Sequence, residues 1–133
     1  MMEIDTKAAV IRAAAILTGS YVAGTVIDDA RKYNQLVLYV DFTIGSLTTA
    51  EIKVEMARAD GTYYQEASES SSVSGGVNTK AISLLIRQLA ATGKTRIAIP
   101  IADADKIKIS VKGTGTVTSS SMAIDAILAK NYA

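Results

Sequence analysis

The feature that most constrains the fold of this chain is an alternation of apolar and polar residues with a period of two. In residues 106–112, Ile107, Ile109 and Val111 alternate with lysines and a serine. Successive side chains of an extended chain point to opposite faces, so this segment has one apolar face and one lysine-bearing face. The alternation resumes in residues 122–128 after a Gly/Thr/Ser-rich segment, GTGTVTSSS. Two half-buried strands joined by a chain reversal are therefore predicted.

Three further segments also favour strands. Residues 50–58 alternate cleanly, and the Asp-Gly pair at 60–61 is typical of a tight hairpin because it tolerates positive φ angles. Residues 36–43 are almost continuously apolar, which is typical of a central strand or of one covered by a partner subunit. Residues 94–101 place three isoleucines on one face, and Pro100, which has no N–H, belongs at a strand end or sheet edge.

The alanine-rich segment 10–17 is compatible with two structures. Thr6 is placed to cap a short helix. A small-residue strand is favoured, because a turn at 18–20 is followed by another extended segment at 21–27.

The apolar segment 81–92 also fits two structures. A helix would end at Gly93. A strand would direct Ile82, Leu84 and Ile86 inward, and the β-rich context favours it.

The length of 133 residues predicts one domain with a substantial core. We expect an all-β fold, a single antiparallel β-sandwich or jelly-roll-like domain of about seven to nine strands, with a short N-terminal helix as the alternative at its start. Residues 1–9 are predicted to be a flexible arm and residues 10–133 the domain itself. Residues 66–80 are rich in serine and glycine and are predicted to be a mobile loop, because they bury too little apolar surface to offset their ordering entropy.

Composition argues against several classes of function. The net charge is +1 and the basic residues are dispersed, so no nucleic-acid partner is expected. No apolar run reaches the about 18 residues of a membrane span, so no membrane partner is expected. Glu3 and Asp5 precede the apolar part of the N-terminal segment, where a signal peptide carries positive charge, so no signal peptide is expected.

The chemistry of an enzyme is also poorly represented. Cysteine and histidine are both absent, which removes thiolates, the commonest general base and the commonest transition-metal ligand. We therefore expect no catalytic, cofactor-binding or metal-binding residues, no cofactor and no enzymatic activity.

Four aspartates are the best candidates for a calcium site, because carboxylate oxygens are the ligands that calcium prefers. Asp28 and Asp29 form one pair, and Asp103 and Asp105 form the other. Polar turns in which these carboxylates accept backbone N–H groups are the favoured interpretation.

Tyr63 and Tyr64 offer a second candidate, a stacking platform for a sugar ring. The favoured alternative is one core tyrosine and one surface or interface tyrosine, since neighbours in a strand point to opposite faces. The glycines of the GTG sequence at 113–115 and of the pair at 75–76 are expected in hairpin turns or bulges, because neither matches a phosphate-binding motif.

The lysine-bearing face of residues 106–112, formed by Lys106, Lys108 and Lys112, has two interpretations. Outward lysines discourage edge-to-edge association of strands. The same lysines are also suited to an acidic surface on a partner.

The order of these segments resembles a known family. LVLYVDFTIGSLTTAEIKVEMARADGTYY, then a Ser/Gly loop, then RIAIPIADADKIKISVKGTGTVTSSSMAIDAIL, is similar to small β-sandwich structural proteins of tailed bacteriophage virions. These include capsid decoration (cement) proteins, and the resemblance covers residues 36–128. It implies a homo-oligomeric structural protein of the virion, assembled in the host cytoplasm, that binds across subunits of the major capsid protein or other virion proteins and stabilises the shell. Contacts are then expected in residues 1–9, in the 66–80 loop and in the C-terminal AKNYA.

Two alternatives remain open. Within virion proteins, the chain is also compatible with a tail, neck or fibre-associated component. In another class, it is compatible with a carbohydrate-binding β-sandwich module that uses Tyr63, Tyr64 and the acidic turns.

Overall fold

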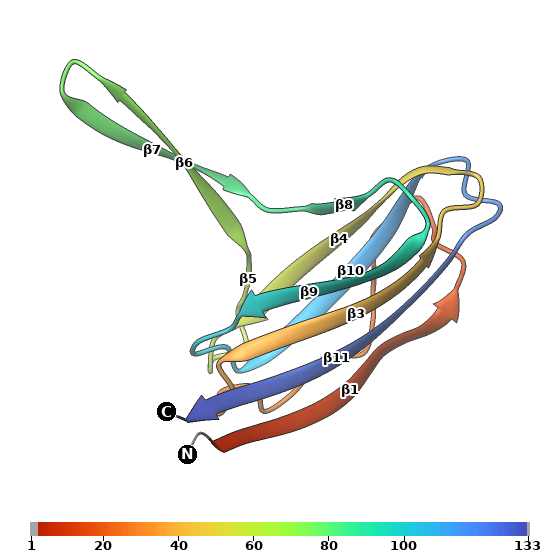
Figure 1. Ribbon diagram of the computed structural model, residues 1–133, viewed down its shortest axis with the longest axis horizontal. Helices are drawn as coiled ribbons and strands as arrows, with labels where there is room; N and C mark the ends of the chain where they lie inside the picture. Colours follow the sequence, from red (N-terminus) through yellow and green to blue (C-terminus); the bar gives the residue numbers. More distant parts are fainter. Residues whose placement is uncertain (1–2, 133) are drawn as a thin grey trace.

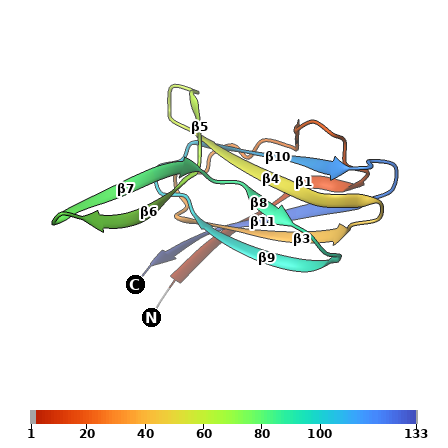
Figure 2. The same ribbon diagram turned by 90° about the horizontal axis from the view of Figure 1, so that it is seen from above.

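The computed structural model describes residues 3–132, which form an antiparallel β-sandwich with a projecting hairpin (Figures 1 and 2). The predicted all-β fold is confirmed. Its eleven strands exceed the about seven to nine expected because several are only two or three residues long. Among residues 3–132 there is no helix with the length and apolarity needed to cross a membrane.

Two sheets pack face to face, and the hairpin forms a third, separate sheet (Figure 2). The front sheet consists, in spatial order, of β1 (Glu3–Ala15), β11 (Ser121–Tyr132), β3 (Gln35–Thr43) and β9 (Gly93–Pro100). The back sheet consists of β2 (Val22–Ala23), β10 (Lys106–Gly115), β4 (Leu47–Ala57) and β5 (Tyr63–Gln65), with β8 (Arg87–Leu89) also paired to β4. The hairpin consists of β6 (Ala67–Ser74) and β7 (Val77–Leu84).

The core lies between the front and back sheets and is formed by the alternating residues that the sequence singles out. The front sheet contributes side chains from β3 and β11, and the back sheet contributes side chains from β4 and β10. Fully buried examples are Leu36, Leu38, Phe42, Met122, Ile124, Ile52, Ile107 and Ile109. Pro100 ends β9, an edge strand, and Gly61 has a φ of 86° in the turn before β5, so both local predictions are confirmed.

The two strands around GTGTVTSSS do not pair with each other. β10 lies in the back sheet and β11 in the front sheet, so the reversal is a crossover between layers. Gly115, at a φ of 87°, marks a bulge where the register of β10 on β4 shifts. The β3–β4 turn is a second crossover, and Ser46 joins the two by donating its hydroxyl to Thr116 O at 2.7 Å and accepting the Ser119 N–H at 3.0 Å.

The N-terminal predictions need one correction. Residues 3–9, expected to be part of a flexible arm, belong to β1, which pairs with β11 from Glu3 onward. Residues 1 and 2 lie outside the described residues. The strand interpretation of residues 10–17 is confirmed as far as Ala15. β1 stays paired with β11 through two register shifts, between Val10 and Arg12 and between Arg12 and Ala15, and Ile11 lies in the core.

Residues 66–80 also differ from the prediction. Ala67–Ser74 and Val77–Leu84 form a regular hairpin in place of a mobile loop, with turn glycines at φ 58° and 77° that confirm the predicted hairpin turn. Ile82 and Leu84 were expected to point into the core, but both are exposed. The predicted strand is thus confirmed for this segment. The predicted burial of its side chains is wrong, because β7 belongs to the projecting hairpin and not to the sandwich.

The β3–β4 crossover depends on a residue without a side chain. Gly45 has a φ of 55°, and a Cβ there would overlap the Ser119 carbonyl. Gly45→Ala should lower the free energy of unfolding by about 2 kcal/mol or more through backbone strain and the clash. Gly19→Ala is the matched control, since its Cβ would meet open space and Ala reduces unfolded-state entropy by up to about 1 kcal/mol. Urea denaturation measures both, and equal effects would contradict the prediction.

Candidate interaction surfaces

The most conspicuous surface is the hairpin β6–β7, residues 67–84, which we call the arm. It extends away from both sheets (Figure 1), and every residue of β6 and β7 is exposed. A two-stranded hairpin is only marginally stable in water when nothing packs on it. We therefore expect the arm to be stabilised by contact with another surface.

The two faces of the arm differ in chemistry. Cross-strand pairs lie on the same face, so the register assigns each residue to one side. One face carries small and mainly hydroxyl-bearing residues, together with Val77: Ser68, Ser70, Ser72, Ser74, Thr79, Ala81 and Ser83. The other, which we call the apolar arm face, carries Val73, Ile82 and Leu84, which are 73%, 70% and 67% exposed. The register also places Ala67, Glu69, Ser71, Asn78 and Lys80 on this face. The apolar side chains of such an amphipathic hairpin can pack against another surface.

The base of the arm is fixed to the back sheet. Glu66 donates its N–H to Val54 O and accepts the N–H of Leu85, so the backbone ladder continues from β4 into the arm. Its carboxylate also forms a two-pronged ion pair with the Arg87 guanidinium, and both side chains are largely buried. Such a geometry holds both strands at the point where they leave the sandwich.

Arg87→Ala should loosen the arm. It leaves the Glu66 carboxylate partly buried without its partner, at a cost of about 1–3 kcal/mol to this junction. Amide hydrogen exchange within residues 67–84 should become faster, while exchange in β3 and β11 stays slow. Arg58→Ala is the control, because Arg58 is an exposed arginine in the turn between β4 and β5, outside the arm. Similar exchange in the two variants would show that the clamp does not order the arm.

The outer face of the front sheet carries a second apolar surface. The registers of the four strands align Ala8, Ile127, Val37 and Ala98 side by side, and we call this set the apolar row. Val10, 61% exposed, lies next to it. The row crosses all four strands without a charge. Its ends, Ala8 and Ala98, are exposed, whereas Ile127 is half-buried and Val37 is 7% exposed.

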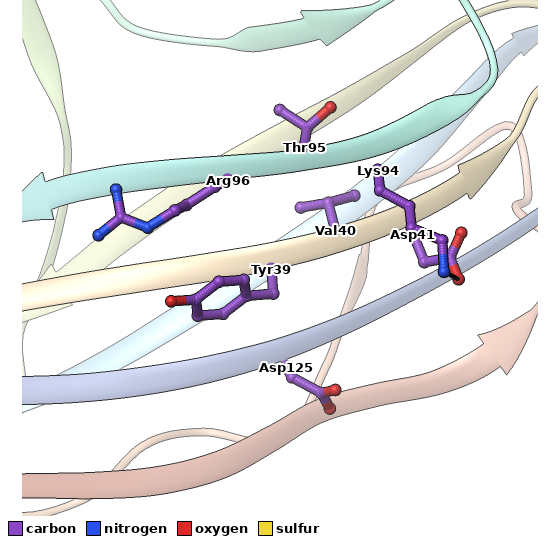
Figure 3. Close-up of a pocket in the computed structure, with 7 residues that line it drawn as sticks. All are labelled: Tyr39, Val40, Asp41, Lys94, Thr95, Arg96 and Asp125. Carbon is purple, nitrogen blue, oxygen red and sulfur yellow. Dashed lines mark ion pairs between the residues drawn. The ribbon is translucent and has the colours of Figure 1, made fainter.

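A polar cluster flanks the apolar row. Tyr39 lies between Arg96 of β9 and Asp125 of β11 (Figure 3), in the register that pairs it with both. Lys94 and Asp41 form an exposed ion pair beside it, at 3.6 Å between Nζ and Oδ2. An open depression of about 310 Å³ lies between these side chains. Neither Arg96 nor Asp125 makes an ion pair with another described residue. Sequence reasoning missed this cluster because its members lie in three distant segments.

The lysine-bearing face of β10 is neutralised within the chain. Lys106 pairs with Asp28 at 3.9 Å, Lys108 with Glu55 at 3.9 Å, and Lys112 with Glu51 at 3.6 Å. This alternating ladder is not a free basic patch for an acidic partner. Protection of a sheet edge is also wrong, because β10 lies inside the back sheet between β2 and β4.

Tyr21 is part of this ladder. The Nζ atoms of Lys53 and Lys112 lie 4.5 Å and 5.0 Å from its ring centroid, and its hydroxyl donates to Glu51 Oε1 at 3.3 Å. Burial raises the pKa of the Tyr21 hydroxyl above its ordinary value of 10.0, and the Glu51 charge and hydrogen bond add to this. The folded state therefore favours the neutral phenol, and this contribution to stability is lost as the pH rises above about 10.

A spectroscopic titration should reveal this residue. Tyr21 should contribute a late component to tyrosinate absorbance because its pKa is raised, and Tyr21→Phe should remove that component. Glu51→Gln should shift it to lower pH, because the charge that opposes ionisation is gone. Tyr64→Phe, at an exposed position, should leave it in place. A late component that persists in Tyr21→Phe would contradict the assignment.

The four aspartates considered as calcium ligands lie in two turns that meet. Asp29 and Asp105 line a common depression with Arg31 and Lys32. Asp29 and Asp103 have φ angles of 54° and 64°, typical of aspartate in a turn. In the part of the chain that the structure describes, no three acidic residues gather in a geometry that holds a metal.

Tyr63 and Tyr64 do not form a joint platform. Adjacent residues in β5 point to opposite faces. Tyr63 is half-buried with Lys108 Nζ 4.3 Å from its ring centroid, while Tyr64 is exposed. The predicted surface tyrosine is confirmed in Tyr64. The predicted core tyrosine is wrong, because Tyr63 lies outside the core and against the Lys108 side chain.

The fold has counterparts among solved structures. SPBc2 prophage-derived protein YomS matches with a TM-score of 0.58 and 16% identity, over 96% of each chain. PBSX exported protein XepA matches with a TM-score of 0.59 and 11% identity, over 96% of this chain but 38% of its own length. A structure from Bacillus endospore appendages, described as disulfide-linked pili, matches with a TM-score of 0.51 and 11% identity, over 99% of this chain and 89% of that one. No family model and no curated protein sequence matches. These likenesses show the sandwich fold.

Proposed function

We propose that this chain is a non-enzymatic structural protein of a phage virion, and specifically a capsid decoration protein that binds across subunits of the major capsid protein. The observation that carries the proposal is the amphipathic arm held on a rigid sandwich. A protein that joins neighbouring subunits needs two contact surfaces at a fixed separation. The arm, whose two faces differ in chemistry, and the body of the sandwich provide two such surfaces on different sheets.

The fold comparisons support the same role by analogy, and this support comes from the shared fold and not from shared site residues. YomS is prophage-derived, and the spore appendages are assembled fibres. A sandwich that serves in a phage-derived protein and in a polymer is suited to repeated contacts with neighbours.

The mechanism follows from multivalency. A capsid under internal pressure fails where neighbouring subunits separate. A small domain bound across each such junction adds contact area in many copies, and linked weak contacts give a stable lattice because each additional contact forms at high effective concentration. The clamp between Glu66 and Arg87 contributes by limiting the ordering entropy lost on binding.

The contact regions are narrower than the sequence alone suggests. Residues 3–9 are paired along β11 and do not provide a free arm. Residues 129–132 of the C-terminal segment belong to β11, and residue 133 lies outside the described part of the chain. The reach of the molecule is therefore concentrated in residues 67–84.

A non-enzymatic role is supported by the side chains available. The sequence contains neither histidine nor cysteine. The exposed aromatic and charged groups around Tyr39 lie on an open sheet face, which suits contact with another surface.

Virions of the phage that encodes this chain provide the test. The chain should remain with DNA-filled heads through density-gradient purification and tail removal, in a fixed ratio to the major capsid protein by quantitative mass spectrometry. Particles lacking its gene should release DNA at a lower temperature, and adding back the purified protein should restore the wild-type value. Absence of the chain from particles would overturn a virion role. Its recovery with tails alone would replace decoration with the tail, neck or fibre alternative.

A further inference from the structure

The apolar side chains of the apolar arm face are exposed in the described part of the chain. Val73, Ile82 and Leu84 are each at least two-thirds exposed, although residues of this type are normally buried. Their regular spacing on one side of a hairpin, with hydroxyl-bearing residues on the other, is the pattern of a sheet whose second layer is supplied by another surface.

The molecule itself carries a surface of matching chemistry. The apolar row of Ala8, Ile127, Val37 and Ala98 runs across the front sheet. Its exposed ends, together with Val10 beside it, offer apolar groups on which a hairpin face can pack. The arm leaves from the back sheet and extends away from the sandwich (Figures 1 and 2), so it does not cover the row of its own chain. The two surfaces can be joined only between copies.

The charges on the two surfaces are complementary. The only charged residues of the arm are Glu69 and Lys80, which share the apolar arm face and pair with each other at 3.6 Å. The row of residues beside the apolar row presents Arg96 and Asp125 on either side of Tyr39 (Figure 3), and neither has an ion-pair partner among residues 3–132. Each surface therefore has one acidic and one basic residue. Two intermolecular ion pairs can form, and no two like charges need to face each other.

The area of contact decides between two ways of joining copies. Each arm strand has eight residues, so one arm face measures roughly 27 Å by 10 Å, or roughly 270 Å². Two arms packed face to face would bury roughly 540 Å² in total, well below the about 1,200 Å² of a specific interface. Two copies that each give and receive an arm would bury roughly 1,100 Å², close to that limit.

We propose that the apolar arm face of one copy packs on the apolar row of a second copy, with Glu69 and Lys80 facing Arg96 and Asp125 of that copy. Each copy gives one arm and receives one. The self-association is therefore a property of the purified chain and does not depend on the virion role proposed above.

Light scattering coupled to size-exclusion chromatography of the purified chain tests the proposal. The wild type should be larger than a monomer, and the mass should fall to that of a monomer in the arm variant Ile82→Ser/Leu84→Ser and in the row variant Ala98→Arg. Ser83→Ala, on the opposite arm face, and Ala91→Arg, an exposed position outside the row, are the matched controls and should keep the wild-type mass. Circular dichroism and thermal unfolding verify that each variant is folded.

Two results would overturn the proposal. A monomeric wild type at all accessible concentrations would exclude the contact. Dissociation by the arm variant but not by Ala98→Arg would show that arms meet each other or another surface.

Cross-linking tests the seating directly, because the natural chain has no cysteine. An Ile82→Cys chain mixed with an Ala98→Cys chain should give a heterodimeric disulfide on mild oxidation. Ser83→Cys is the control, since it lies next to Ile82 but on the hydroxyl-bearing face, and its yield with Ala98→Cys should be at least fivefold lower. Equal yields from the two arm positions would overturn the proposed orientation. This outcome is independent of whether the chain is found in virions.

Discussion

The structure depends on the burial of two alternating apolar faces against each other. Side chains such as Leu38 of β3 and Ile109 of β10 are removed from water only because both sheets present their inward residues at the same level. Register is therefore tightly specified in the sandwich, since a shift of one residue would expose a whole face. At one end of the sandwich, Ser46 in the β3–β4 crossover hydrogen-bonds to the β10–β11 crossover, and this contact holds the two layers together there.

The arm follows the opposite logic. It has the same period of two, but among the described residues no second sheet packs on it, so its apolar residues stay exposed. What fixes its direction is a junction, the ladder and ion pair at Glu66, and not a core. In this domain the sandwich provides the stable fold and the arm provides the contact surface. Substitutions in the arm therefore need not destabilise the sandwich.

Periodicity in the sequence is sufficient for the strands and their inward faces in the sandwich, because alternation directly encodes which side of a strand is apolar. It does not encode what lies on that side. Ile82 and Leu84 alternate as correctly as Ile107 and Ile109, and only the path of the chain after Glu66 separates an exposed face from a buried one. For the same reason, the alternation alone does not reveal that β10 and β11, which are adjacent in sequence, lie in different sheets.

Surface chemistry was harder to predict because it is assembled from distant segments. The lysines of β10 appear free in the sequence, but their acidic partners lie on β4 and in the turn at Asp28. The cluster around Tyr39 needs three strands to exist. The lysines of β10 thus have acidic partners in the same chain, whereas Arg96 and Asp125 of the front sheet form no ion pair with the residues whose side chains are described and lie beside an uncharged row. This asymmetry makes the front sheet the face where a complementary surface gains most, since contact there desolvates apolar side chains and supplies the missing counter-charges together.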